Sequence, residues 1–346
     1  MLLYRSGGSP FHGALVLSLR PLRQFYLASV ATCSRAARRA SVLALASLAA
    51  SHAAYAHGIA GNRLFPGTLS FDDPAVADEA TLPNFSYANQ PADGGNVTDN
   101  RINWSFSRLL TPNVAIVVDN SWIHRDWRVA QRSGFDTTNL GVKWEVYRNN
   151  LHETLVAASI AWGIGHSGAQ GTGANAPHMI KPGIFFGQGF GDLPENLRWL
   201  QPFGITGAVV LEHPTGETST NLGIDPLSGQ LGPLPTRYVD TLRWGFAIQY
   251  NTLYLAKRIG NELPKQEPVN QFVPLVEFAF ESASGKQTLA TVNPGLSYVA
   301  TTWQVAIEAI VPLNRESGHG VGARTQLLLF LDDLAPSLFG KPLLSK

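Results

Sequence analysis

Hydrophobic and polar residues alternate along most of the chain after residue 97, most clearly in the stretch TLRWGFAIQY at residues 241–250. Its even-numbered positions hold Leu, Trp, Phe, Ile and Tyr, and its odd-numbered positions hold Thr, Arg, Gly, Ala and Gln. Because successive side chains of a β-strand point to opposite faces, this pattern predicts a strand with one apolar face and one polar or small face. A sheet in a membrane and a sheet on a soluble core both contain such strands.

The same alternation recurs about eleven times at a mean spacing of about 22 residues, and no segment has a convincing helical period. The predicted strands lie at residues 101–108, 114–122, 139–148, 154–166, 180–190, 197–211, 241–250, 273–281, 288–300, 302–312 and 322–331, and residues 253–259 begin a further one. Segments of about ten residues, separated by short turns and long polar loops, are typical of transmembrane β-barrels.

The tryptophans favour a barrel over a secreted β-sandwich, which is the alternative fold. Seven of the eight lie on the apolar parity of the predicted strands: Trp104, Trp122, Trp144, Trp162, Trp199, Trp244 and Trp303. So many would crowd the core of a sandwich, whereas in a barrel they form girdles at the membrane interfaces. We therefore predict an all-β fold, an antiparallel transmembrane β-barrel of about 12 strands, since bacterial single-chain barrels have even strand numbers.

The N-terminal region has the residue order of a secretory signal peptide. A basic stretch at residues 35–39 precedes the apolar run at residues 41–50, and the sequence Ala-Tyr-Ala that ends at Ala56 is a small-x-small cleavage pattern. We predict cleavage after Ala56 and export to the outer membrane of a Gram-negative bacterium, with an uncleaved anchor as the alternative.

These features divide the chain into four parts. A leader and signal peptide occupies residues 1–56, an irregular N-terminal extension residues 57–96, the barrel residues 97–334, and a C-terminal tail residues 335–346. The extension is rich in proline and acidic residues and has little period. We expect it either to lie on the periplasmic side of the membrane or to enter the lumen of the barrel.

Composition and charge agree with a membrane barrel. Apolar residues make up 45 % of the chain and charged residues only 15 %, against about 25 % charged in a typical soluble domain. Cleavage after Ala56 would remove six of the 26 basic residues, none of the 25 acidic ones, and the single cysteine, Cys33, which leaves a net charge of −5. A chain with this balance has no basic surface for nucleic acid.

The sequence contains no pattern that predicts catalysis. The histidines after residue 56 are scattered, and none has a partner at the spacing of metal ligands. The glycine-rich stretches at residues 168–173 and 187–191 do not lie between a strand and a helix, as a phosphate-binding loop requires. No paired nucleophile and base is evident. We therefore expect no enzymatic activity, no catalytic residue, no metal and no cofactor.

Charged side chains on the inward parity of the predicted strands are the candidate functional residues. They are Lys143, Glu145, Arg243, Glu277, Glu281, Glu308 and Arg324. On the lipid face each basic one would cost about 2–4 kcal/mol at mid-depth, so we place them in the lumen, where they either line a solute path or brace the wall. The acidic members outnumber the basic ones, so an open pore would be weakly cation-selective.

Three short motifs near the C-terminus resemble a known family. They are NPGLSY at residues 293–298, WQV at residues 303–305 and VPL at residues 311–313. This run resembles the C-terminal strands of the outer-membrane transporter family named for the meta-pathway of phenol degradation. The similarity is clearest over residues 290–334. The sixteen residues that follow Phe330 depart from the many outer-membrane barrels that end on an aromatic residue.

The resemblance implies an outer-membrane barrel with a role in the uptake of small hydrophobic or aromatic compounds, and it supplies no catalytic residue. The expected function is therefore a monomeric outer-membrane channel or transporter for small solutes, whose partners are outer-membrane lipid and the solute. The alternatives are a structural barrel without transport and a secreted β-sandwich binding module.

Overall fold

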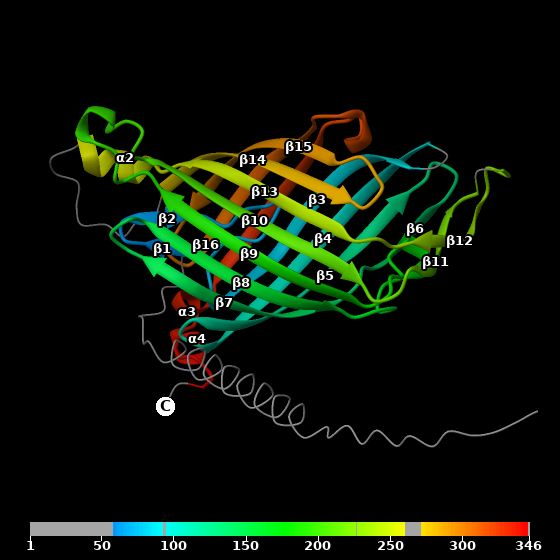
Figure 1. The fold of residues 1–346 in the computed structure, drawn as a ribbon, viewed down its shortest axis with the longest axis horizontal. Coiled ribbons are helices and arrows are strands. Elements are labelled where there is room, and N and C mark those ends of the chain that lie inside the picture. The colour runs from blue at the N-terminus through cyan, green and yellow to red at the C-terminus, as the bar shows by residue number, and fades with distance from the viewer. Residues whose placement is uncertain (1–57, 93–94, 226, 260–270, 345–346) are drawn as a thin grey trace, which may run out of the picture. The chain divides into compact units, whose positions relative to one another are not determined.

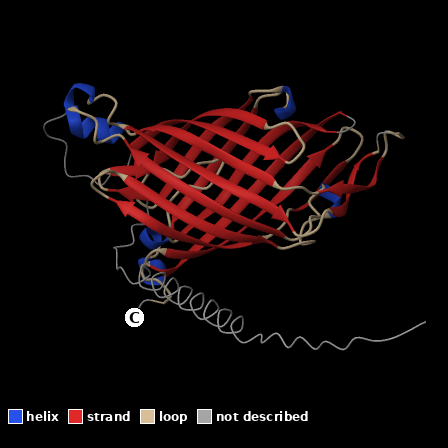
Figure 2. Cartoon of the chain, in the orientation of Figure 1, coloured by secondary structure: helices blue, strands red, loops and turns tan. Residues whose placement is uncertain are grey.

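Twelve antiparallel strands close into a barrel in the computed structural model, which describes residues 58–92, 95–225, 227–259 and 271–344 (Figures 1 and 2). Each strand pairs with its neighbour along the chain, and β17 pairs with β3 to complete the ring. The barrel prediction and its strand number are confirmed, and closure excludes the β-sandwich. The predicted cleavage site after Ala56 lies outside the described residues.

The barrel strands follow one another with few insertions. They are β3 (Glu79–Ala92), β4 (Gly95–Thr111), β5 (Val114–Asp126), β7 (Asn139–Asn149), β8 (Thr154–Gly163), β9 (Met179–Gly189), β10 (Phe203–Pro214), β13 (Thr241–Tyr250), β14 (Gln271–Ala283), β15 (Leu289–Val299), β16 (Trp303–Pro312) and β17 (Gly322–Phe330). The other strands are β1 (Gly58–Ala60), β2 (Arg63–Phe65), β6 (Gln131–Phe135), β11 (Thr218–Ile224) and β12 (Leu231–Arg237). The short helices are α2 (Thr252–Ile259), α3 (Leu331–Leu334) and α4 (Pro336–Phe339).

The predicted alternation separates the two faces of the wall. Val142 and Ile160, which pair across β7 and β8, are exposed on the outside, and so is Ile307 on β16. Lys143 and Glu277, one residue away from apolar outward positions, are buried inside. Apolar side chains outside and polar side chains inside are the arrangement that lipid imposes on a spanning barrel.

The alternation breaks at one point in β7. A β-bulge shifts the register there, so that Glu145 pairs with Ala157 and Tyr147 pairs with Val156. The extra residue, Val146, moves Tyr147 to the outer face, although simple parity places it inside with Lys143 and Glu145. A bulge adds one unpaired residue to one strand, which reverses the parity of everything after it.

The division of the chain into parts needs correction at both ends of the barrel. The barrel begins at Glu79 and not at residue 97, because β3 lies within the stretch that we expected to be irregular. Its alternation is interrupted where the pairing shifts between Thr81 and Asn84, and Pro83 in that gap has no backbone N–H for the ladder. The C-terminal tail also has structure, since α3 and α4 follow β17 directly.

Two predicted strand segments are also wrong. The strand expected at residues 197–211 starts only at Phe203, because residues 195–197 form a 3₁₀ turn, η2, in the loop before it. Trp199 therefore lies in that loop and not on the wall. Residues 253–259 form helix α2 and do not begin a strand.

The two ends of the barrel differ. We call the end where β3 begins and β17 ends the base, and the opposite end the mouth. The longest connection at the mouth, residues 215–240, carries the hairpin β11–β12, which contacts the loop turn η1 (Gln170–Thr172). Ile224 of this hairpin packs with Val97 of β4 and with Trp127. The hairpin therefore covers part of the mouth.

A charge on the outer face should prevent assembly in the membrane. We predict that Val142→Arg destabilises the barrel by about 2–4 kcal/mol, the cost of a basic side chain facing lipid at mid-depth. The same substitution on the same strand at Asn139 is the control, because Asn139 faces the lumen with its Nδ2 atom 2.8 Å from Oδ1 of Asp119. Heat-modifiability gels measure the folded fraction, and equal tolerance of arginine at both positions would contradict the assignment of the faces.

Candidate functional site

Residues 58–78, which we call the luminal segment, run inside the barrel before the chain enters β3 (Figure 1). The segment begins with the hairpin β1–β2 and continues as an irregular stretch. It contacts the inner face of the wall on all sides, through β4, β5, β7, β8, β9, β10, β13, β14, β15, β16 and β17. Of the two placements that we expected for this region, it takes the one inside the lumen.

Arg63 binds the hairpin to the connections at the base. Its side chain is fully buried, and its Nε and Nη2 atoms donate to Oε2 of Glu153 at 3.1 and 3.0 Å. Further hydrogen bonds go to the backbone carbonyls of Gln201 and Pro202, the latter at 2.6 Å. The guanidinium also lies 4.1 Å from the ring centroid of Tyr254 in α2. One side chain thus joins the segment to three separate connections.

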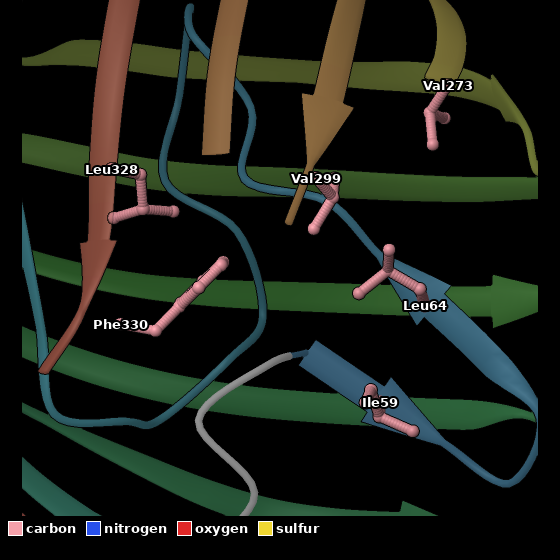
Figure 3. Close-up of a cluster of buried hydrophobic side chains, with 6 residues drawn as sticks. All are labelled: Ile59, Leu64, Val273, Val299, Leu328 and Phe330. Atoms are coloured by element: carbon pink, nitrogen blue, oxygen red, sulfur yellow. The ribbon is translucent and has the colours of Figure 1, made fainter. Parts of the chain in front are cut away.

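Apolar side chains seat the same hairpin against the wall. Ile59 and Leu64 pack with Val273, Val299, Leu328 and Phe330, which line the base from β14, β15 and β17 (Figure 3). Phe330, the last residue of β17, therefore points into the lumen and not toward lipid. Burying side chains of this size stabilises the docked hairpin by about 1.5–3 kcal/mol each.

Gly67 and Gln304 form a paired contact at the centre of the segment. The backbone N–H of Gly67 donates to Oε1 of Gln304 at 3.0 Å, and Nε2 of Gln304 donates to the carbonyl of Gly67 at 2.8 Å. A Cβ atom on Gly67 would lie 2.9 Å from Cδ2 of Leu328, so only glycine fits without a shift of its neighbours. The side-chain amide of Gln304 thereby replaces a strand partner for the segment.

Glu277 accepts two adjacent backbone N–H groups of the segment. Its Oε1 atom accepts from Leu69 and its Oε2 atom from Ser70, both at 2.8 Å. The Glu277 side chain is completely buried. Hydrogen bonds to a charged group contribute about 1.5–3 kcal/mol, and an unpaired buried carboxylate would be costly.

The hydroxyl of Ser70 connects the segment to three further strands. Its Oγ atom accepts from Nδ2 of Asn293 at 2.6 Å and from Nη1 of Arg324 at 2.9 Å, and it donates to Oε1 of Glu308 at 3.2 Å. Arg324 and Glu308 are themselves paired across β16 and β17 at 2.8 Å. A single serine therefore joins side chains from β15, β16 and β17.

Ion pairs hold the remainder of the segment. Nζ of Lys143 lies 2.7 Å from Oδ2 of Asp72 and 2.6 Å from the carbonyl oxygen of Asp73. Carboxylate oxygens of Asp72, Asp73 and Glu79 lie within 4.8 Å of one another. The ammonium group among them supplies the positive charge that such a cluster requires. Asp78, at the end of the segment, pairs with Arg108 of β4.

All seven predicted luminal residues lie on the inner face. Four of them bind the luminal segment, namely Lys143, Glu277, Glu308 and Arg324. The other three pair with side chains of the wall, Glu145 with Arg148 at 2.5 Å and Arg243 with Glu281 at 2.8 Å. The expected cation preference depended on Glu277 and Glu308 as lining of a path, but both carboxylates are buried beneath the segment.

The mouth half of the lumen carries a row of alternating charges. Lys181, Glu212, Arg243 and Glu281 come from the neighbouring strands β9, β10, β13 and β14, and each pairs with the next at 2.8–3.0 Å. The Arg243 side chain is still 53 % exposed and that of Glu281 32 % exposed. Solvent therefore reaches the wall on the mouth side of the luminal segment.

Several residues of the site could not be identified from the alternation of hydrophobic and polar positions. Arg63, Gly67 and Asp78 lie in the aperiodic stretch, and Gln304 faces inward as an ordinary polar position. One signal was available for Arg63, because it is the only basic residue between Arg39 and Arg101. An isolated charge in a long uncharged or acidic region indicates a specific partner, which here is Glu153.

No family model matches the sequence, and no curated protein is significantly similar to it. The fold is similar to the NanC porin (8 % identity, 71 % of this chain and 98 % of that one, TM-score 0.36) and to the β domain of the Bordetella autotransporter BrkA (8 %, 74 % and 99 %, 0.45). It is also similar to the CymD monoaromatic hydrocarbon channel (9 %, 73 % and 87 %, 0.36). At these values the likeness is one of general barrel architecture. The family resemblance over residues 290–334 stays a prediction.

Among the described residues, no helix has the length and apolar character needed to cross a membrane.

Proposed function

We propose that this barrel spans the outer membrane and conducts small solutes when the luminal segment leaves its docked position. The exposed apolar outer face, with the closed ring of strands, supports a location in lipid, because closure leaves no unpaired edge. The longest connection lies at the mouth, and three of the five connections at the base are short turns, at residues 112–113, 150–153 and 300–302. This difference supports a base that faces the periplasm.

The observation that carries this proposal is the division of the lumen into two halves. On the mouth side, charged side chains such as Arg243 remain accessible to solvent. On the base side, the luminal segment fills the ring and occupies buried polar groups such as Glu277 and Gln304. This division supports an aqueous entry on the mouth side, with the docked segment as its barrier.

The solute class comes from the resemblance over residues 290–334, which implies small hydrophobic or aromatic compounds. The row of alternating charges at the mouth is electrically balanced, since Lys181 and Arg243 are matched by Glu212 and Glu281. A balanced row produces no strong field of one sign, which suits an uncharged solute. The proposal includes no enzymatic activity.

The second candidate is a structural barrel without transport. It is favoured by the many contacts of the luminal segment, in particular the buried pair of Arg63 and Glu153. In that case the segment is a permanent part of the core.

Solute uptake by proteoliposomes separates the two candidates. We expect vesicles that contain the unmodified protein to take up labelled phenol or benzyl alcohol faster than protein-free vesicles, and to exclude a sugar of larger size. Because small aromatic compounds also cross lipid unaided, uptake is compared at equal lipid and low temperature with vesicles that contain heat-denatured protein. Equal rates for native and denatured protein would favour the structural barrel.

A further inference from the structure

The C-terminal segment, residues 331–344, is fixed to the outside of the barrel at its base. Arg108 of β4 donates to the carbonyls of Leu338, Phe339 and Lys341 at 3.0–3.3 Å. The guanidinium also lies 5.2 Å from the ring centroid of Phe339. Three backbone carbonyls in and just after α4 thus share one partly buried partner.

The end of the segment is hydrogen-bonded to the end of β4. The backbone N–H groups of Leu343 and Leu344 donate to the carbonyls of Leu109 and Leu110 at 3.0 and 2.8 Å. Both residues lie beyond Ser107, where the pairing between β3 and β4 stops, and the register between β4 and β5 skips Leu110. The segment therefore occupies a defined place beside β4.

The place that the C-terminal segment occupies adjoins the apolar outer face of the barrel wall. The Phe339 ring lies edge-on against Phe106, with 6.2 Å between their centroids. Phe106 has the same parity on β4 as Ile102, which is exposed on the outer face of the wall. The segment covers the lower end of the surface that contacts lipid.

The segment leaves an unusual number of leucines uncovered. Those with more than half of their surface exposed are Leu334, Leu338, Leu343 and Leu344. Clustered apolar side chains at the edge of a lipid face are typical of interfacial anchors. Burial raises the pKa of Asp332 in α3 to about 7, helped by the neighbouring Asp333, so this carboxyl is partly neutral near pH 7 and easier to place beside the headgroups.

We infer that residues 331–344 form an interfacial foot, which lies in the headgroup layer of the inner leaflet with its exposed leucines in contact with lipid acyl chains. This inference rests on the proposed location of the barrel in the membrane. The hydrogen bonds from Arg108 to three carbonyls of the segment support this inference. Backbone groups without a partner are costly at the edge of the hydrocarbon.

Site-specific fluorescence tests the inference. The only cysteine of the sequence, Cys33, precedes the predicted cleavage site, so a single engineered cysteine can carry the environment-sensitive dye NBD. We compare Leu338→Cys, Ile307→Cys and Leu227→Cys in phosphatidylcholine vesicles with and without doxyl-labelled acyl chains. Ile307 is 56 % exposed on the outer face of β16, and Leu227 is 96 % exposed in the β11–β12 turn at the mouth.

We expect the dye at 338 to shift to shorter wavelength and to lose fluorescence to doxyl groups near the headgroups more than to deep ones. The dye at 307 should be quenched more by deep groups, and the dye at 227 by neither. Leu334→Cys repeats the test within α3 if the first variant assembles poorly.

Two results would overturn the inference, and they are distinguishable. If 307 is quenched while 338 and 334 behave like 227, the barrel is in lipid but the C-terminal segment stands in water, available to a soluble partner. If 307 is also unquenched, the membrane location fails and the foot fails with it.

Discussion

The substitution Gly67→Leu should open the lumen and raise the conductance of the barrel in planar bilayers. A Cβ atom at this position would lie 2.9 Å from Cδ2 of Leu328 and 3.4 Å from Nε2 of Gln304. The added side chain cannot be accommodated while the paired contact with Gln304 is kept. Overpacking of this kind costs about 1–3 kcal/mol, so the undocked population should rise about 5- to 150-fold.

The change acts on the segment and not on the wall, so the barrel should remain folded and heat-modifiable. Gly232→Leu is the matched control, because Gly232 in β12 has no atom within 4 Å of its added Cβ. Conductance at fixed voltage is measured for the native protein and both variants. Limited proteolysis after residue 58 reports whether the segment has left the wall. A displaced segment with unchanged conductance would show that the segment is not the barrier.

The wall of the barrel could be predicted from the sequence because its strands follow the simple rule that lipid would impose on them. Each spanning strand must present apolar side chains outward, and residues 241–250 follow this rule at every position. The rule fails where the chain adds a residue, as at Val146, or where a register shift and a proline interrupt the strand, as between Thr81 and Asn84 in β3. Both failures are local and leave no trace in the parity of the neighbouring strands.

The candidate site could be predicted only in part, since inward parity identifies a charge but not its partner. Inward parity identified four luminal residues that bind the luminal segment, namely Lys143, Glu277, Glu308 and Arg324. Their partners in that segment lie far away in sequence. Glu277 and Leu69, for example, are 208 residues apart. The luminal segment has no period because it packs against the whole ring and not against one face, so neither its path nor its contacts follow from its pattern.

Loss of the Arg63 side chain should release the hairpin β1–β2 from the base. In Arg63→Met the carboxylate of Glu153 stays buried without its cation, and the carbonyls of Gln201 and Pro202 lose a donor. Removing one member of a buried ion pair costs about 3–5 kcal/mol. Hydrogen exchange of the backbone amides at residues 59–65 measures the docking free energy directly, and these amides should exchange faster while those of β13 stay protected.

A double-substitution cycle separates the lost ion pair from the lost packing. Glu153→Gln in the Arg63→Met background removes the unpaired charge, so it should restore part of the protection that Arg63→Met removes. The control is Arg198→Met, since Arg198 and Glu195 form an exposed pair with 3.9 Å between Nη1 and Oε1, and exposed pairs contribute about 0–1 kcal/mol. Equal exchange in Arg63→Met and Arg198→Met would mean that the hairpin is held without Arg63, by the apolar contacts of Ile59 and Leu64 and by the hydrogen bond from Arg148 to the carbonyl of Ile59. In that case release of the segment would have to begin at Gly67 and not at the base.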